Sequence, residues 1–360
     1  SYTYAMETLQ GTDMVRHLKV STPYPFPEKL AVEFLTGLDE VLCLEELDPV
    51  IEQELTYICG KYHLPTKITG KLDGTTACAG ENTRDSVSSY IHTFLGLEKA
   101  GSSSLPTPPE LPVRPPVLCA GCPHRASFYA VKKAMKGQKT IFCGDIGCYT
   151  LGNAMPLDMV DTCLCMGAGL NIAQGIEKVE PDTTCFAFVG DSTFFASAIT
   201  GVVNAVYNQA NMILIVLDNS TTAMTGHQPH PGTGRTVMGE IVQKINIEQV
   251  LRGIGVTDVK TVDPLDLNSS VACVREMADK TGVKAIIFKS PCIAITKPEL
   301  SLHIAAEKCI GCKKCIRELG CPAIVLDNGN VCIDDTMCTG CGLCSQVCPA
   351  AAIIGGEKHE

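Results

Sequence analysis

The sequence has no tryptophan, few aromatic residues and no long apolar run. Aromatic residues make up 5% of its 360 residues. No uninterrupted apolar stretch approaches the roughly 20 residues that a membrane-spanning helix requires. No basic segment followed by an apolar one stands at the start, so no export signal is visible. These features predict a protein without a membrane partner, and we expect a cytoplasmic location.

Positive charge is also scarce. The chain has 29 Lys and Arg against 39 Asp and Glu, a formal net charge of −10 at pH 7. This balance argues against a protein that binds nucleic acid non-specifically. Hydrophobic residues account for 45% of the chain and charged residues for 19%, which is the composition of a folded globular protein. A chain of this length exceeds one ordinary core, so we expect several domains.

Cysteine is the residue in excess, with 21 in the chain. Disulfide scaffolds are usually short secreted domains, whereas these cysteines form C-x2-C groups in a long chain. The spacing therefore indicates metal ligation in a reducing compartment. The clearest groups are "CIGCKKCIRELGCP" and "CTGCGLCSQVCP" near the C-terminal end.

These two groups have the spacing of a bacterial-type ferredoxin with two 4Fe–4S clusters. The first three thiolates of each group reach three irons of one cluster, and the fourth Cys, followed by Pro, ligates the other cluster. One cluster therefore takes Cys309, Cys312, Cys315 and Cys348, and the other takes Cys338, Cys341, Cys344 and Cys321. Five residues rather than three precede Cys321, which departs from the usual pattern. Zinc sites or free thiols are the alternatives, although zinc usually takes two separated Cys pairs.

Four segments are predicted along the chain: 1–100, a small α/β linking domain; 101–116, a Pro- and Ser-rich linker; 117–298, a second α/β domain; and 299–360, the α+β ferredoxin domain. In the second α/β domain, short apolar runs alternate with amphipathic segments. This pattern predicts the α/β class, with a doubly wound parallel sheet covered by helices on both faces. The expected strands are 140–143, 185–189, 212–217 and 285–289.

Two of these strands end in residues suited to a cation and a diphosphate. Gly190, Asp191 and Ser192 follow one strand where a helix begins, and Asp218 and Asn219 end another. A carboxylate and an amide oxygen can share one hard cation, while the helix start offers N–H groups to phosphate. The spacing resembles the thiamine diphosphate motif. By that resemblance, Asp191 and Asn219 bind Mg²⁺ through their side chains; a turn with a solvated carboxylate is the alternative.

Three further residues extend this predicted site. The same resemblance implies that Thr221 binds Mg²⁺ through its carbonyl. Upstream, Gly167 and Gly169 in "MGAGLNIAQG" could let the backbone approach the diphosphate. Close packing of a helix on the sheet is the alternative reading of these glycines.

Histidines provide the candidate acid–base groups. Three histidines of the predicted domain 117–298 are candidates: His124, His227 and His230. His227 is the best placed, because it follows Thr225 and Gly226 on the loop after the predicted Mg²⁺ residues. We predict catalytic roles for His227 and His124. A solvated or structural histidine is the alternative in each case.

Four more cysteines stand at strand ends or in loops, where they could converge on one edge of the sheet: Cys119, Cys122, Cys148 and Cys292. In 2-oxoacid:ferredoxin oxidoreductases, cysteines in similar contexts hold a 4Fe–4S cluster near the thiamine. The resemblance implies a third cluster here, and a zinc site or unrelated thiols are the alternatives. The remaining cysteines of this domain are expected to serve in packing; they are Cys143, Cys163, Cys165 and Cys185.

Taken together, the motifs "CAGCPHR", "GDIGCYTLG", "VGDSTFF", "DNSTTAMTGHQPHPGTG" and "SPCIA", with the ferredoxin tail, resemble the alpha subunit of indolepyruvate ferredoxin oxidoreductase. The resemblance covers nearly the whole chain. It implies conversion of aryl pyruvates such as indolepyruvate, with CoA, into aryl-acetyl-CoA, CO₂ and reduced ferredoxin. It also implies a beta subunit as partner and an oligomer of heterodimers.

One residue that the family requires is not found, the Glu that contacts the aminopyrimidine ring. The family carries it in a separate pyrimidine-binding domain, and no Glu in residues 1–116 stands in a matching context. In the family, a linking domain follows the pyrimidine-binding domain. Residues 1–100 resemble this linking domain, but its opening strand is missing. We therefore expect a C-terminal portion that is inactive unless another segment or chain supplies that domain. The alternatives are an oxidoreductase for another 2-oxoacid, or an electron-transfer subunit without a catalytic site of its own.

Overall fold

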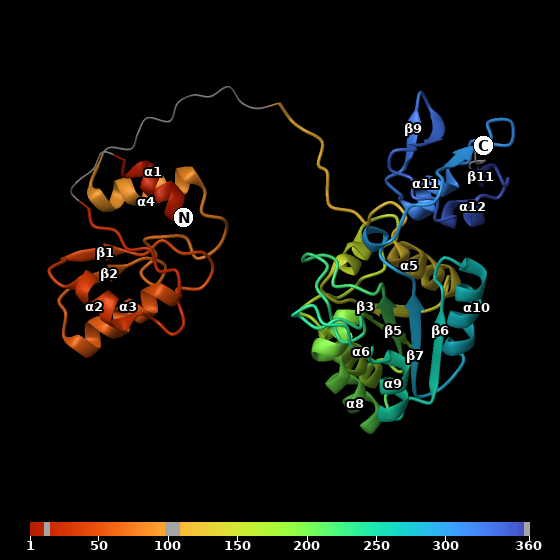
Figure 1. Cartoon of the computed structure of the whole chain (residues 1–360), viewed down its shortest axis with the longest axis horizontal. Helices are drawn as coiled ribbons and strands as arrows, with labels where there is room; N and C mark the ends of the chain where they lie inside the picture. The colour runs from red at the N-terminus through yellow and green to blue at the C-terminus, as the bar shows by residue number, and fades with distance from the viewer. Residues whose placement is uncertain (11–14, 98–108, 356–360) are drawn as a thin grey trace. The chain divides into compact units, whose positions relative to one another are not determined.

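The computed structural model describes residues 1–10, 15–97 and 109–355. The chain divides into two compact units, Ser1–Leu111 and Pro112–Glu360, which are both visible in Figure 1. Each unit buries apolar side chains of its own. The finer four-part division expected from the sequence remains a prediction.

The first unit is a small α/β arrangement around a two-stranded parallel sheet. Leu35 and Ile58, from two of its helices, are fully buried in its core. The buried Glu52 accepts the backbone N–H groups of Lys71 and Leu72 and so fixes the turn after the second strand. The elements are α1 (Tyr2–Thr8), α2 (Glu28–Leu35), β1 (Glu40–Leu42), α3 (Val50–Tyr62), β2 (Lys67–Thr69) and α4 (Arg84–Leu95).

The second unit is built on a five-stranded parallel sheet in the order β3-β4-β5-β7-β6. All parallel strands end at the same edge, so polar residues that follow them gather there. The strands are β3 (Thr140–Cys143), β4 (Thr184–Gly190), β5 (Met212–Asp218), β6 (Asp258–Val262) and β7 (Val283–Lys289). The predicted strands correspond to β3, β4, β5 and β7. Strand β6 was not predicted; it is an edge strand with partly exposed residues.

Alternate residues along the central strands enter two different cores, as the two-residue period of a strand requires. Phe186 and Phe188 of β4 join the core under α5 (Pro123–Ala134) and α10 (Leu267–Ala278). Ala187 and Val189 join the core under α6 (Ala168–Val179), α8 (Ile199–Tyr207) and α9 (Ile247–Ile254). Helices therefore cover both faces of the sheet, as Figure 1 shows. The predicted α/β class with a doubly wound sheet is confirmed.

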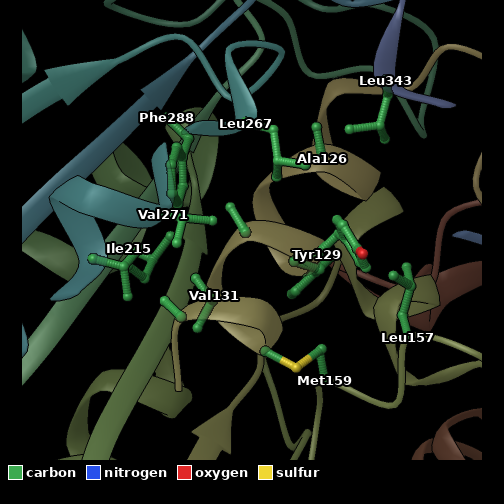
Figure 2. Close-up of a cluster of buried hydrophobic side chains, with 14 of the residues drawn as sticks. Ala126, Tyr129, Val131, Leu157, Met159, Ile215, Leu267, Val271, Phe288 and Leu343 are labelled. Carbon is green, nitrogen blue, oxygen red and sulfur yellow. The ribbon is translucent and has the colours of Figure 1, made fainter. Parts of the chain in front are cut away.

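The cysteine-rich tail is docked on this domain through a shared core. Leu343 of the tail belongs to the same buried cluster as Ala126 and Tyr129 of α5, and Figure 2 shows the three side chains in one view. The Tyr129 hydroxyl also donates to the Glu318 carboxylate of the tail. The tail contains β8 (Leu302–Ile304), α11 (Lys314–Leu319), β9 (Ile324–Asp327), β10 (Asn330–Ile333), α12 (Leu343–Val347) and β11 (Ile353–Gly355).

Lys284 on β7 provides a test of the sheet's energetics. It is 3% exposed, and burial lowers its pKa to about 8, while Asp258 and Glu177 oppose the shift. The unfolded chain then binds more protons between pH 8 and 10.5, so the free energy of unfolding rises with pH in that window. Replacing Lys284 by Met should remove this rise and stabilise the protein at pH 7 by about 1–3 kcal/mol.

Denaturant unfolding of both proteins from pH 7 to 10.5 measures the effect. Among the described residues, the Lys284 ammonium donates a hydrogen bond only to Asn211, which is exposed and can bind water instead. Equal pH profiles for the two proteins would contradict the prediction.

Among the described residues, no helix is both long and apolar enough to cross a membrane.

Candidate functional site

Four strands deliver polar residues to the same edge of the sheet. Asp145 follows β3, Asp191 follows β4, Asn219 follows β5 and Cys292 follows β7. Two hydrogen bonds link the last two segments, since the Cys292 N–H donates to the Asn219 carbonyl at 2.9 Å and the Ser290 N–H to the Asp218 carbonyl at 3.0 Å. The predicted cation residues and one predicted cluster cysteine are thus direct neighbours.

Asp191 directly follows β4, next to the central strand β5, and is 3% exposed. It begins α7 (Asp191–Thr193), which continues through a π-helical turn, η2 (Phe194–Ala198), into α8. One carboxylate oxygen accepts the Ser192 N–H, and the other accepts the Ser220 N–H, both at 2.8 Å. Asp191 therefore holds the turn that presents Asn219, although the two residues belong to different strand ends.

A second buried carboxylate, Asp218, makes this edge rich in negative charge. Its pKa is raised by burial first and by the charge of Asp191 second, while Lys289, at 3.6 Å, lowers it. Two neighbouring buried carboxylates are stabilised by a bound cation, and carboxylate and amide oxygens are ligands that Mg²⁺ takes. The residues present therefore fit a magnesium ion. Asn219 and Thr221 are both buried beside them.

His124 contacts the amide of Asn219 rather than an open site. Its Nε2 lies 3.2 Å from Asn219 Nδ2, and the side chain is 3% exposed on α5. Burial lowers the pKa of His124 to about 4 against the opposing charge of Asp191. A neutral imidazole that accepts from the amide N–H would turn the Asn219 oxygen away from the ring. The structure therefore places the His124 ring against the Asn219 amide, and its predicted catalytic role stays a prediction.

The second histidine predicted to be catalytic, His227, is not brought to the carboxylates. It is exposed, has a φ of 62° and lies on the loop after β5. His230 occupies the position instead: it is buried, and its Nε2 lies 3.2 Å from Asp191 Oδ2 without hydrogen-bond alignment. Its ring stacks on Phe195, with the centroids 5.9 Å apart. The loop turns back at residues 223–226, ahead of both histidines, where the Gly226 N–H donates to the Ala223 carbonyl and Thr222 pairs with Gln228.

The two predicted glycines play different parts. Gly167 has a φ of 83° and caps α6, and its N–H donates to Asp145 Oδ1 at 2.8 Å. A Cβ on Gly169 would lie 2.3 Å from the Gly144 carbonyl oxygen and 3.0 Å from that of Cys143. At Gly169, the absence of a side chain therefore allows α6 to pack closely on the sheet, which is the alternative stated for this glycine.

Replacing Gly169 by Ala should destabilise the protein by about 1–3 kcal/mol, because backbone must move to admit the methyl group. Gly175 is the matched control on the same helix: it is exposed, and a Cβ there would meet no atom within 4 Å. Gly175→Ala should stabilise the helix by about 0.5–1 kcal/mol. Thermal unfolding measures both, and a neutral Gly169→Ala would show that the contact is not tight.

Tyr149 packs at this edge of the sheet and was not predicted from the sequence. Its hydroxyl lies 2.9 Å from Thr193 Oγ1 and donates to the Ile146 carbonyl at 3.0 Å. A Cβ on Gly190 would lie 2.4 Å from its ring. Gly190 is therefore required by the approach of Tyr149, and the only sequence signal was that Tyr149 follows a predicted ligand, Cys148.

Cysteines of the predicted third group influence one another's pKa values. Burial raises the pKa of Cys148, and the nearby residues Cys292 and Cys119 raise it further. Burial also raises the pKa of Cys122 to about 12; the backbone N–H of His124 and the charge of Arg125 oppose it, and Cys119 adds to it. All four cysteines thus lie within electrostatic reach of at least one other.

In the tail, the structure sorts the eight predicted ligands into the two expected sets. One small cavity is lined by Cys309, Cys312, Cys315 and Cys348. A second is lined by Cys321, Cys338, Cys341 and Cys344, together with Ala120 and Gly121 of the "CAGC" loop. Cys348 thus lies with the first three cysteines of the first group, and Cys321 with those of the second group. This exchange is what the spacing predicts.

The unusual spacing before Cys321 has a structural explanation. The extra residues complete α11 (Lys314–Leu319), which ends at Gly320 in the left-handed conformation, with a φ of 58°. Cys321 then reaches the cavity of the second group. The longer segment is thus taken up by a helix rather than by a distorted loop.

Two of the cysteines expected to pack do not. Cys143 and Cys185 are buried, whereas Cys163 and Cys165 are exposed, because the apolar segment around them is a surface loop. Within residues 1–10, 15–97 and 109–355, no three or more His, Cys, Asp or Glu side chains are gathered tightly enough to hold a single metal ion. In a 4Fe–4S cluster each thiolate binds a different iron, so its four sulfurs need not meet at one point.

Two protein-family models match parts of the second unit, one over the parallel sheet and one over the cysteine-rich tail. Residues 145–288 match the family described as "Thiamine pyrophosphate enzyme, C-terminal TPP binding domain". Residues 331–354 match the "4Fe-4S binding domain" family. The first match contains β4, β5 and the Asp191 edge, and the second contains Cys338, Cys341, Cys344 and Cys348.

The chain is related over nearly its whole length to indolepyruvate oxidoreductase subunit IorA, which confirms the resemblance predicted from the motifs. The IorA subunit of Methanothermobacter marburgensis is 41% identical over 98% of this chain and 58% of that protein. The IorA subunit of Thermococcus kodakarensis is 37% identical over 100% of this chain and 60% of that protein. The chain therefore spans less than two thirds of the length of these relatives.

A solved structure of 2-oxoglutarate:ferredoxin oxidoreductase from Magnetococcus marinus is also similar. It is 20% identical, has a TM-score of 0.45, and the match covers 52% of this chain and 67% of that chain.

Proposed function

We propose that this chain provides the diphosphate and Mg²⁺ site and the internal electron path of a 2-oxoacid:ferredoxin oxidoreductase that acts on aryl pyruvates. The overall reaction joins the acyl group of the 2-oxoacid to CoA and releases CO₂, a proton and an electron pair. Thiamine diphosphate, when bound, supplies the electron sink for the decarboxylation. Indolepyruvate is the proposed substrate, because the relatives that match the whole chain are indolepyruvate oxidoreductase subunits.

The observation that carries this proposal is a direct contact between the proposed Mg²⁺ site and a cysteine of the proposed third cluster. The Cys292 N–H donates to the Asn219 carbonyl at 2.9 Å, so a proposed cluster ligand lies next to a proposed Mg²⁺ ligand. The cluster would therefore lie next to the bound thiamine diphosphate and could accept its electrons directly. An electron-transfer subunit without a catalytic site would have no use for the buried pair Asp191 and Asp218.

Each group of residues has a defined task in this proposal. Asp191 and Asn219 bind Mg²⁺ through their side chains and Thr221 through its carbonyl, while Gly190, Ser192 and Gly167 shape the backbone around the diphosphate. His124 orients the Asn219 amide, and His230 rather than His227 faces Asp191. Cys119, Cys122, Cys148 and Cys292 hold the cluster nearest the thiamine, and the two tail clusters pass electrons to an external ferredoxin.

We further propose that turnover needs a pyrimidine-binding domain from outside these 360 residues, and a beta subunit. No glutamate in residues 1–116 has the sequence context of the one that contacts the aminopyrimidine. Mixing the chain with those partners should produce ferredoxin reduction that depends on an aryl pyruvate and CoA. A preference for an aliphatic 2-oxoacid would overturn the proposed substrate and leave the reaction class intact.

Iron and acid-labile sulfide per chain, measured after anaerobic reconstitution together with EPR of the reduced protein, test the electron path. About twelve irons per chain are expected for three 4Fe–4S clusters. A content of about eight would leave the tail intact and contradict the third cluster.

A further inference from the structure

Arg125, three residues beyond Cys122, has no role in the function proposed so far. It lies on α5 and is 4% exposed, which is unusual for an arginine. Both terminal nitrogens of its guanidinium donate to backbone carbonyls, and its Nε has no partner among the described residues. A buried cation with this many directed contacts calls for an explanation.

The contacts of Arg125 join two segments that are far apart in the sequence. Nη1 donates to the carbonyls of Leu319 at 2.6 Å and Gly320 at 2.9 Å, at the end of α11 and directly before Cys321. Nη2 donates to the carbonyls of Leu118 and, at 3.4 Å, Cys119. The Arg125 side chain therefore joins two backbone segments. One contains Cys119, a ligand of the proposed third cluster, and the other directly precedes Cys321, a ligand of a tail cluster.

A second contact brings the same two segments together. A Cβ on Gly121 would lie 1.9 Å from Thr339 Oγ1, so the "CAGC" loop touches the "CTGC" loop of the tail. Ala120 and Gly121 also line the cavity of Cys321, Cys338, Cys341 and Cys344. The cavity of the other tail group is lined by none of the residues 118–125.

The charge of Arg125 is retained in this setting. An arginine guanidinium stays protonated in proteins at neutral pH. A fixed positive charge favours the more negative, reduced form of a nearby iron–sulfur cluster, and hydrogen bonding and net charge are among the factors that set cluster potentials.

We propose that Arg125 is the positioning residue of an electron-transfer junction between the cluster of Cys119, Cys122, Cys148 and Cys292 and the tail cluster of Cys321, Cys338, Cys341 and Cys344. It fixes the spacing of these two clusters through its hydrogen bonds and raises their reduction potentials through its charge. The proposal rests on the proposed function, because it requires the third cluster. It leaves the cluster of Cys309, Cys312, Cys315 and Cys348 outside the junction.

Two substitutions separate the charge of Arg125 from its hydrogen-bonding fork. In Arg125→Met both are lost, so the midpoint potentials of the two junction clusters should shift to more negative values and their magnetic coupling in EPR should weaken. In Arg125→Lys the charge is kept, so the potentials should stay near those of the wild type. The coupling should still weaken, because a lysine ammonium cannot reproduce the four contacts.

The matched control is Arg317→Met, which removes a positive charge beside the other tail cluster. Arg317 is exposed and donates to the Cys312 carbonyl. It should leave both junction clusters unchanged. Single replacements of Cys148, Cys341 and Cys312 by Ser assign each EPR signal to its cluster.

The outcomes distinguish this proposal from the one on which it rests. A wild-type content of about eight irons would overturn the third cluster and the junction together. A content of about twelve, with unchanged potentials in Arg125→Met, would overturn the junction alone. If Arg125→Met fails to fold or to take up iron, Arg125→Lys remains decisive, because unaltered coupling there would show that Arg125 does not set the spacing.

Discussion

Replacing Asp191 by Asn should weaken the binding of Mg²⁺ with thiamine diphosphate by more than about 100-fold, since even changes outside the direct ligands of a metal cost about 10–100-fold. Asn has nearly the shape of Asp and can still accept one hydrogen bond, but it lacks the negative charge that a divalent cation needs. The loss should therefore come from charge and from the weakened hold on the Ser220 N–H. Isothermal titration of thiamine diphosphate in the presence of Mg²⁺ measures the change.

Asp182→Asn is the control for this measurement. Asp182 is exposed in the turn before β4, on the same segment of chain, and removing its charge should leave binding unchanged. Equal binding by Asp191→Asn and the wild type would reject Asp191 as a ligand. It would favour the alternative in which the Gly-Asp turn is structural.

The second large effect is expected at Cys148, where the Cys148→Ala protein should lose about four irons per chain. The thiol stands at the start of η1 (Cys148–Asn153), within reach of Cys292 and Cys119. A cluster that lacks one of its thiolates loses a strong bond to iron and becomes accessible to solvent. The EPR signal of one cluster should disappear while the two tail signals persist.

Cys163→Ala serves as the comparison, because Cys163 lies on the same domain, is exposed and belongs to none of the three proposed ligand sets. Its iron content should equal that of the wild type. If Cys148→Ala and Cys163→Ala retain the same iron, Cys148 is not a ligand, and the third cluster must be sought elsewhere or abandoned.

The sheet and the tail could be predicted because their signals are local. Strands β4 and β5 are continuous apolar runs, buried on both faces, and each of the two tail groups shows its ligands within a short stretch of sequence. Strand β6 escaped prediction because it is an edge strand in which Lys260 and Thr261 interrupt the apolar pattern. A partly exposed edge strand gives no clear signal in sequence.

The contacts that define the site join residues that are far apart in the sequence, and a short motif cannot predict such pairs. Arg125 and Leu319 are 194 positions apart, and His124 and Asn219 are 95 apart. The choice between His227 and His230 depended on the path of the loop after β5, which places His230 and not His227 beside Asp191. Residue types at the site were therefore predictable, whereas the partner of each residue was not.

The core shared by α5 and the tail has a consequence for how electrons travel. A ferredoxin domain on a loose tether would deliver electrons by swinging between a loading and an unloading position, and each transfer would wait for a diffusive encounter. Here Leu343, Ala126 and Tyr129 are parts of one packed interior, so the tail has no such freedom without unfolding that interior. In the proposed function, the second unit would therefore conduct electrons as one rigid body, and only the last transfer, to the external ferredoxin, would depend on a diffusive encounter.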